Sequence, residues 1–192
     1  MTVTAIDSVS ALIVVDLQNG AKSNPFVHPI ADVAGRAAAL AAAYRAAGLP
    51  VVLMTYVGGA SGRSDMARNR AASGAVTPAP AEGWDQLLDV LDEQPSDHAI
   101  ARSTWGSFYG TDLQDHLAGL GVTQVVIAGV ATSLGVESTA REARDRGYNV
   151  VLATDAMTDM HPAAHEQSLS WAFPLLGEVA TTDEVLALLA AR

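Results

Sequence analysis

The sequence predicts a three-layer α/β/α domain built around a mainly parallel six-stranded sheet. Short apolar runs rich in valine and isoleucine alternate with segments in which apolar residues recur at helical spacing. Strands that alternate with helices form right-handed βαβ units, which place helices on both faces of a parallel sheet. The chain has 192 residues, 49% of them hydrophobic, and no repeat or linker divides it. We therefore expect residues 1–192 to form one domain.

Six segments are expected to form the strands. Four are continuous apolar runs, which is typical of strands buried on both faces, and two are weaker candidates. The four runs are Ala11–Val15, Val51–Met54, Gln124–Ala128 and Asn149–Ala153, and the weaker pair is His98–Ala101 and Gly177–Ala180.

Helices are expected between these strands. Apolar residues at helical spacing from Ile30 to Tyr44 predict a helix that stops at Gly48, because glycine readily adopts the left-handed conformation that ends helices. A second helix should follow Thr132 or Ser133. Gly147 is expected to end it in the same way.

Two further helices are expected near the C-terminus. Pro162 suits a first helical turn, where its missing N–H is not needed, and Pro174 is expected to end that segment. The run from Thr181 to Glu184 has the spacing of a capping box, and it precedes an apolar helical segment.

The segment from Val57 to Gly83 interrupts the alternation. It holds five glycines and two prolines and shows no clear period. Three of the ten arginines in the chain, Arg63, Arg68 and Arg70, lie in it. Long irregular segments in compact domains are often functional. Two interpretations stay open here: a surface excursion, or a lid whose arginines bind an anion.

Composition excludes several classes of function. The chain has no cysteine, so disulfides, thiolate metal sites and thiol nucleophiles are impossible. A formal charge of −10 disfavours nucleic acid and anionic membranes as partners. No apolar run has the length of a membrane span, and the N-terminal residues lack the pattern of a signal peptide. We therefore expect a cytoplasmic protein.

Chemically useful residues follow two of the predicted strands. In an open parallel sheet, ligands bind beyond the carboxyl ends of the strands. Asp16 and Gln18 come directly after the first strand, although an aspartate here can also simply cap a turn. Arg102 ends the third strand, and three aromatic residues follow it. These are Trp105, Phe108 and Tyr109, which could wall a pocket or pack in the core.

A third strand end begins at Gly129 and leads into a helix, where free backbone N–H groups can hold an anion or an oxyanion. The run lacks the glycine patterns of phosphate-binding and dinucleotide-binding loops and the GxSxG pattern of serine hydrolases. His161 and His165 have a spacing that could bind a metal, but Pro162 separates them and no acidic partner is evident.

Three blocks resemble the isochorismatase-like hydrolase family, which includes nicotinamidases and carbamoylsarcosine amidases. They are Val14-Val-Asp-Leu-Gln18, Arg102-Ser-Thr-Trp-Gly-Ser-Phe-Tyr-Gly-Thr-Asp-Leu113, and the run from Gly129 to Ala143 with Gly147-Tyr-Asn-Val and Asp155-Ala156 beyond it. The resemblance extends from about Thr4 to Leu189, and it implies the Rossmann-like fold of that family.

The resemblance also implies which residues are catalytic. Most members use an Asp–Lys–Cys triad, which corresponds here to Asp16, Arg102 and Gly135. True isochorismatases also have glycine at the third position, and they hydrolyse a vinyl ether with the aspartate as general acid and water as nucleophile. The arginine is the larger departure. It favours an ionised Asp16 whereas burial opposes ionisation, and the sequence does not decide between them.

The expected site is completed by residues around this triad. A cis peptide bond is expected between Val130 and Ala131, because the family bends its chain there. Nicotinamidases of this family bind a metal through an aspartate and histidines after the first strand and near the second, whereas the stretch Thr55–Gly59 has no histidine. We therefore expect no metal, and we expect no cofactor. The substrate-binding residues are expected to be Gln18, Trp84, Trp105, Phe108, Tyr109, Val130, Ala131, Thr132, Ser133 and Leu134.

Three functions are compatible with these residues. The first is a cysteine-independent hydrolase of a small anionic substrate, with Asp16 exchanging protons and Arg102 holding a carboxylate. The second is a catalytically impaired pseudoenzyme that binds a small molecule, which the changed lysine favours. The third is a structural subunit of a homo-oligomer. The family tends to form dimers and tetramers, so we expect a homo-oligomer in any case.

Overall fold

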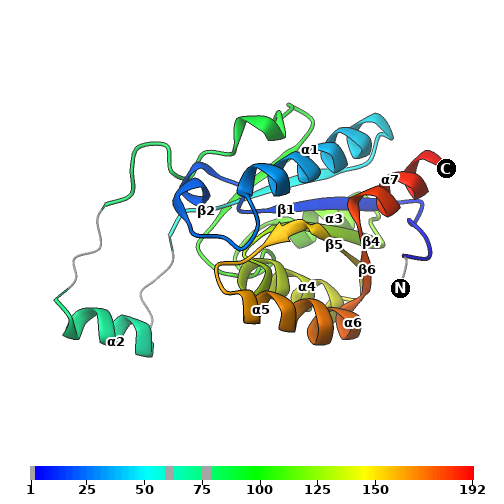
Figure 1. The fold of residues 1–192 in the computed structure, drawn as a ribbon. Helices are drawn as coiled ribbons and strands as arrows, with labels where there is room; N and C mark the ends of the chain where they lie inside the picture. The colour runs from blue at the N-terminus through cyan, green and yellow to red at the C-terminus, as the bar shows by residue number, and fades with distance from the viewer. Residues whose placement is uncertain (1–2, 59–62, 75–78) are drawn as a thin grey trace.

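The computed structural model describes residues 3–58, 63–74 and 79–192. Its centre is one six-stranded sheet in the order β3-β2-β1-β4-β5-β6, and every neighbouring pair is parallel (Figure 1). The predicted fold class is therefore confirmed. The strands are β1 (Ser10–Val15), β2 (Val51–Tyr56), β3 (His98–Arg102), β4 (Gln124–Val130), β5 (Asn149–Thr158) and β6 (Glu178–Ala180).

Helices cover both faces of the sheet. On one face lie α1 (Ile30–Ala46) and α7 (Thr182–Ala190). The other face is covered by α3 (Leu113–Gly119), α4 (Glu137–Asp145) and α6 (Phe173–Leu176). The remaining helices are α2 (Asp65–Ala72), α5 (Pro162–Gln167), the 3-10 turns η1 (Asn19–Ser23) and η2 (Asp89–Leu91), and the π-helical turns η3 (Thr132–Val136) and η4 (Ser168–Ala172).

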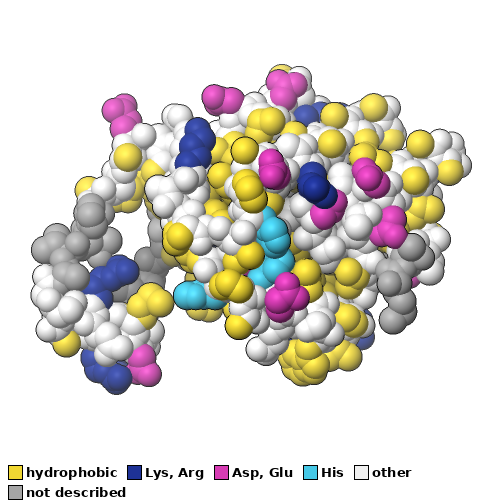
Figure 2. Space-filling model, in the orientation of Figure 1, with side chains coloured by type: hydrophobic (Ala, Val, Ile, Leu, Met, Phe, Trp, Pro, Cys, Tyr) yellow, Lys and Arg dark blue, Asp and Glu magenta, His cyan; other side chains and the backbone are white. Residues whose placement is uncertain are grey.

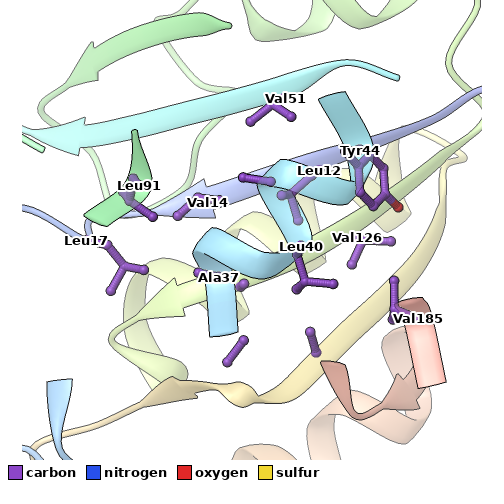
Figure 3. Close-up of a cluster of buried hydrophobic side chains, with 14 of the residues drawn as sticks. Leu12, Val14, Leu17, Ala37, Leu40, Tyr44, Val51, Leu91, Val126 and Val185 are labelled. Atoms are coloured by element: carbon purple, nitrogen blue, oxygen red, sulfur yellow. The ribbon is translucent and has the colours of Figure 1, made fainter. Parts of the chain in front are cut away.

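Burial on both faces explains why the central strands are continuous apolar runs. Along β1, Leu12 and Val14 pack in the core beneath α1 and α7, and Ile13 and Val15 pack in the opposite core. Figure 3 shows the first of these cores, with Tyr44 of α1 beside Leu12. All six β1 residues are buried, so the strand that leads to the candidate site is held firmly from both sides.

The predicted helix ends are largely confirmed. Gly48 and Gly147 have φ angles of 68° and 87°, the left-handed conformation that ends a helix at little cost for glycine. Thr181 and Glu184 form the expected capping box at the start of α7. Among the described residues, no helix combines the length and the apolar character needed to cross a bilayer.

The prediction for Pro174 was wrong. The chain continues from α5 through the π-helical turn η4 into α6, which ends only at Leu176. Pro174 lies in the first turn of α6, where a missing N–H costs no helical hydrogen bond. The helical path therefore passes through the proline and ends two residues after it.

A helix lies inside the segment from Val57 to Gly83, which was expected to lack a period. It is α2, and the side chain of Ser64 caps it by accepting a hydrogen bond from the Ala67 N–H (3.1 Å). None of its residues is buried, and it projects away from the body (Figure 1). A helix without a buried face needs no apolar stripe, which explains why the pattern gave no signal. We call α2 and the described residues on either side of it the α2 arm. Figure 2 shows basic side chains on the α2 arm and acidic side chains spread over the visible face of the body.

Candidate active site

The candidate site starts at the carboxyl end of β1. Its neighbours β2 and β4 pair with Val15 through Met54 and Gly129, so Asp16 leaves the sheet between them. Gly129 has a φ of 116°, and a side chain there would come within 2.0 Å of the Val15 carbonyl oxygen. Only glycine allows the two strand ends to approach this closely. Asp16 itself has a positive φ of 51°, which directs the chain away from the sheet.

Asp16 and Arg102 form a buried ion pair. Arg102 lies on β3, two strands away from β1, and its side chain reaches across the end of β2. Its Nη2 donates to Asp16 Oδ2 at 3.0 Å, and its Nη1 donates to the Thr104 carbonyl oxygen. The arginine side chain is 1% exposed and that of Asp16 18% exposed. The predicted convergence of these two strand ends is therefore confirmed.

Burial decides the ionisation of Asp16. Loss of hydration raises the pKa of its carboxyl from 3.8 to about 6, although the charge and hydrogen bond of Arg102 act in the opposite direction. The other carboxyl oxygen, Oδ1, is buried and has no hydrogen-bond partner among the described residues. A carboxyl group with a pKa near neutrality and an unused oxygen is suited to proton transfer.

Gly135 lies in the turn that follows β4. The Val130–Ala131 peptide bond is cis, as predicted, and η3 then leads into α4. A Cβ atom on Gly135 would lie 3.3 Å from Arg102 Nη2, 3.2 Å from the Val130 carbonyl oxygen and 3.0 Å from Val15 Cγ1. The third expected member of the triad therefore adjoins the Asp16–Arg102 pair, and the space beside it is narrow.

A carboxylate that the sequence analysis missed holds this turn. Asp159 follows β5 and is 1% exposed. Its Oδ2 accepts hydrogen bonds from the Ser133 N–H and the Ser133 hydroxyl, both at 2.8 Å, and its Oδ1 accepts one from the His161 N–H. Burial acts to raise its pKa, but the hydrogen bonds outweigh burial and hold the pKa below its ordinary value. The predicted strand ended at Ala153, whereas β5 extends to Thr158, so no sequence signal indicated that Asp159 follows a strand.

Replacing Asp159 with asparagine should lower kcat about tenfold and leave KM nearly unchanged, because the turn that carries Gly135 loses a charged acceptor of two hydrogen bonds. The control is Asp155→Asn, because Asp155 Oδ1 accepts two similar hydrogen bonds from Thr182 at the start of α7. Both variants should lose about 1–3 kcal/mol of unfolding free energy, measured by urea denaturation. Equal kcat values for the two variants would contradict a specific role for Asp159.

A cavity of about 300 Å³ opens beside Asp16. This is the lower end of the usual range for small-molecule sites. Six of the predicted substrate-binding residues line it: Gln18, Trp84, Trp105, Val130, Ala131 and Leu134. It is also lined by residues that the sequence analysis did not identify, namely Gly20, Ala21, Asn24, Phe26, Tyr56 and Met160.

The other predicted substrate-binding residues do not reach the cavity. Phe108 is buried in the core, 5.9 Å from the Tyr148 ring between centroids. Tyr109 is 72% exposed and does not line the cavity. Thr132 and Ser133 do not line the cavity; Thr132 bonds to His165 Nδ1 (2.9 Å) and Ser133 bonds to Asp159.

Gln18 connects the loops around the cavity. Its Oε1 accepts a hydrogen bond from the Tyr56 N–H (2.7 Å), and its Nε2 donates to the carbonyl oxygens of Tyr56 (3.0 Å) and Trp84 (3.3 Å). Its amide is thus already engaged with the backbone. Gln18 holds the end of β2 and the Trp84 loop in place around Asp16.

The histidines do not form a metal site in the described part of the chain. His165 is 2% exposed and bonds to Thr132, and its ring centroid lies 5.0 Å from that of His28. His161 is exposed. No group of three or more potential metal ligands occurs among residues 3–58, 63–74 and 79–192.

Comparison with known proteins finds relatives along most of the chain. Residues 10–184 match the model of the isochorismatase domain. The isochorismatase family protein YecD of Escherichia coli O157:H7 is 36% identical over 180 residues, which cover 92% of this chain and 94% of YecD. The ureidoacrylate amidohydrolase RutB of Methylobacterium radiotolerans is 33% identical over 184 residues, 83% of this chain and 71% of RutB.

A solved structure extends the agreement to three dimensions. An isochorismatase family protein from Burkholderia thailandensis superposes with a TM-score of 0.86 at 36% identity, covering 97% of this chain and 98% of that one. The domain match, the sequence relatives and the shared fold lead to one conclusion: this chain belongs to the isochorismatase family of hydrolases.

Proposed function

We propose that this chain is a cysteine-independent hydrolase of a small molecule, with Asp16 as general acid and water as nucleophile. One observation carries the proposal: a buried carboxyl group whose pKa is raised to about 6 lines a cavity next to a residue without a side chain, Gly135. Burial keeps a fraction of Asp16 protonated near neutral pH, which is the state that a general acid requires.

The proposed hydrolysis proceeds without a covalent bond between enzyme and substrate. Asp16 Oδ1 gives its proton to the substrate, and this weakens the bond to the leaving group. Water adds to the electron-poor carbon, the leaving group departs with its bond electrons, and the proton lost by water restores Asp16. Arg102 supports this cycle as a positioning residue, because its Nη2 holds Asp16 Oδ2 and leaves Oδ1 for the proton.

The second candidate is the pseudoenzyme, in which the cavity binds a small molecule without turnover. The observation that favours it is Arg102, where most of the family has lysine. In this alternative the buried ion pair has only a structural role. Cytoplasmic location, homo-oligomeric assembly as a dimer or tetramer, and the lack of nucleic-acid partners stay predictions.

A substrate screen separates the two candidates. Small vinyl ethers including isochorismate, together with small esters and amides, are incubated with wild-type protein and with Asp16→Asn, and products are followed by mass spectrometry. Hydrolysis of a compound by wild type alone supports the enzyme. Equal background from both proteins on every compound supports the binding module.

A further inference from the structure

The charges around the cavity restrict which molecules can occupy it. Among the described residues that line it, Asp16 is the only one with an ionisable carboxyl or a cationic group. Gln18, Asn24 and Tyr56 contribute neutral polar groups, and the other side chains in the wall are apolar or aromatic. An anion in this cavity would therefore meet a carboxylate and no lining cation.

Arg102 offsets part of the Asp16 charge, but it is not exposed to a ligand in the cavity. Its side chain is 1% exposed, and its two terminal nitrogens donate to Asp16 and to the Thr104 carbonyl oxygen. Its Nε has no partner among the described residues but is itself buried. It lies behind Asp16 and does not line the cavity. The space between Arg102 and Gly135 is too narrow for a carboxylate, because a single Cβ atom there would already touch three neighbours within 3.3 Å.

The cationic side chains of Lys22 and of the α2 arm do not line the cavity either. Lys22 Nζ donates to Asn19 Oδ1 (2.7 Å) and is exposed, and it does not line the cavity. The arginines of the α2 arm, Arg63, Arg68 and Arg70, are absent from the cavity wall in the described residues. The interpretation of that segment as an anion-binding lid therefore has no support in the geometry.

We propose that the site takes an uncharged, flat molecule whose ring lies against Trp84 and Trp105, and that it discriminates against the corresponding carboxylate. This inference rests on the proposed function and replaces the anionic substrate expected from the sequence. Aromatic walls favour planar ligands through stacking. A like charge placed in a partly desolvated site is strongly unfavourable.

Binding tests this directly at pH 8, where Asp16 is mostly ionised according to its pKa of about 6. The probes are matched pairs: benzamide with benzoate, and cinnamamide with cinnamate. Quenching of tryptophan fluorescence is measured in a Trp171→Phe background, because Trp171 is 59% exposed and lies outside the cavity. Each amide should bind at least about tenfold more tightly than its acid.

A charge introduced into the wall should reverse the preference. Met160 lines the cavity and has no part in the proposed proton transfer. Met160→Arg should tighten benzoate binding about tenfold or more, whereas the neutral control Met160→Gln should not. Equal binding of the acids and amides by the Trp171→Phe protein would overturn the inference, and so would failure of all four probes to bind.

The inference and the proposed function fail in different ways. Amide-selective binding without hydrolysis of any screened compound would leave the inference standing and would reject the enzyme. Hydrolysis that depends on Asp16 but accepts only carboxylate-bearing compounds would support the enzyme and reject the inference.

Discussion

Asp16→Asn is expected to lower kcat/KM by about 10²–10⁴-fold on any compound that the wild-type protein hydrolyses, because that is the usual contribution of a general acid. Asparagine has nearly the same shape, and its carbonyl oxygen can still accept the hydrogen bond from Arg102 Nη2. It has no proton to give at working pH. Binding of an uncharged ligand, measured by tryptophan fluorescence, should change little.

A matched control separates proton transfer from the loss of a buried ion pair. Asp97 is 1% exposed at its side chain and pairs with Arg45 Nη2 at 2.7 Å. Asp97 directly precedes β3 and Asp16 directly follows β1. Because the strands are parallel, Asp97 lies at their amino ends and Asp16 at their carboxyl ends. Asp97→Asn should be destabilised in thermal melts, as expected when a buried pair is broken, but should keep its turnover. A similar loss of activity in both variants would show that Asp16 acts only through the fold.

Gly135→Ala is expected to reduce kcat/KM about 10²-fold, because a shift of about 1 Å in the reacting groups can cost that much. The added methyl group would press on Val15 Cγ1, the Val130 carbonyl oxygen and Arg102 Nη2. Gly135 does not have a positive φ, so alanine suits its backbone. The expected defect comes from displacement of the guanidinium, because Arg102 Nη2 holds Asp16.

Arg102→Lys should therefore partly restore the Gly135→Ala variant. Lysine has no second terminal nitrogen beside residue 135, but it can still place a cation near Asp16. We expect the double variant to be about tenfold more active than Gly135→Ala alone. Additive losses in this double-mutant cycle would show that the two positions are not coupled. Gly135→Cys alone should not create amidase activity, since its Cβ atom would meet the same three atoms.

The fold was predictable because the residues that form it repeat a simple pattern. Strands such as Ala11–Val15 are apolar without interruption, since both faces are covered, and the glycines after α1 and α4 end those helices where expected. The parallel strands then bring Asp16, Arg102 and Gly135 to one edge. Parallel topology explains the shared edge, and the length of the Arg102 side chain explains its contact with Asp16 across the end of β2.

The cavity wall was only partly predictable, because side-chain direction depends on packing. Trp105 and Phe108 lie three residues apart in one aromatic run, but the first lines the cavity and the second enters the core. Phe26 and Met160 reach the cavity from loops that carry no chemical motif. The accessibility of Arg102 was also beyond the sequence, because its burial behind Asp16 depends on the geometry of three strands.

The pH dependence of kcat/KM tests the central claim most directly. A general acid works in its protonated form, and the pKa of Asp16 is raised to about 6 by burial. Activity on an uncharged substrate should therefore be constant at low pH and fall about tenfold per pH unit above about pH 6. Asp16→Asn should lack this transition. A wild-type rate that is flat from about pH 5 to pH 8, or that rises through this range, would contradict Asp16 as the general acid.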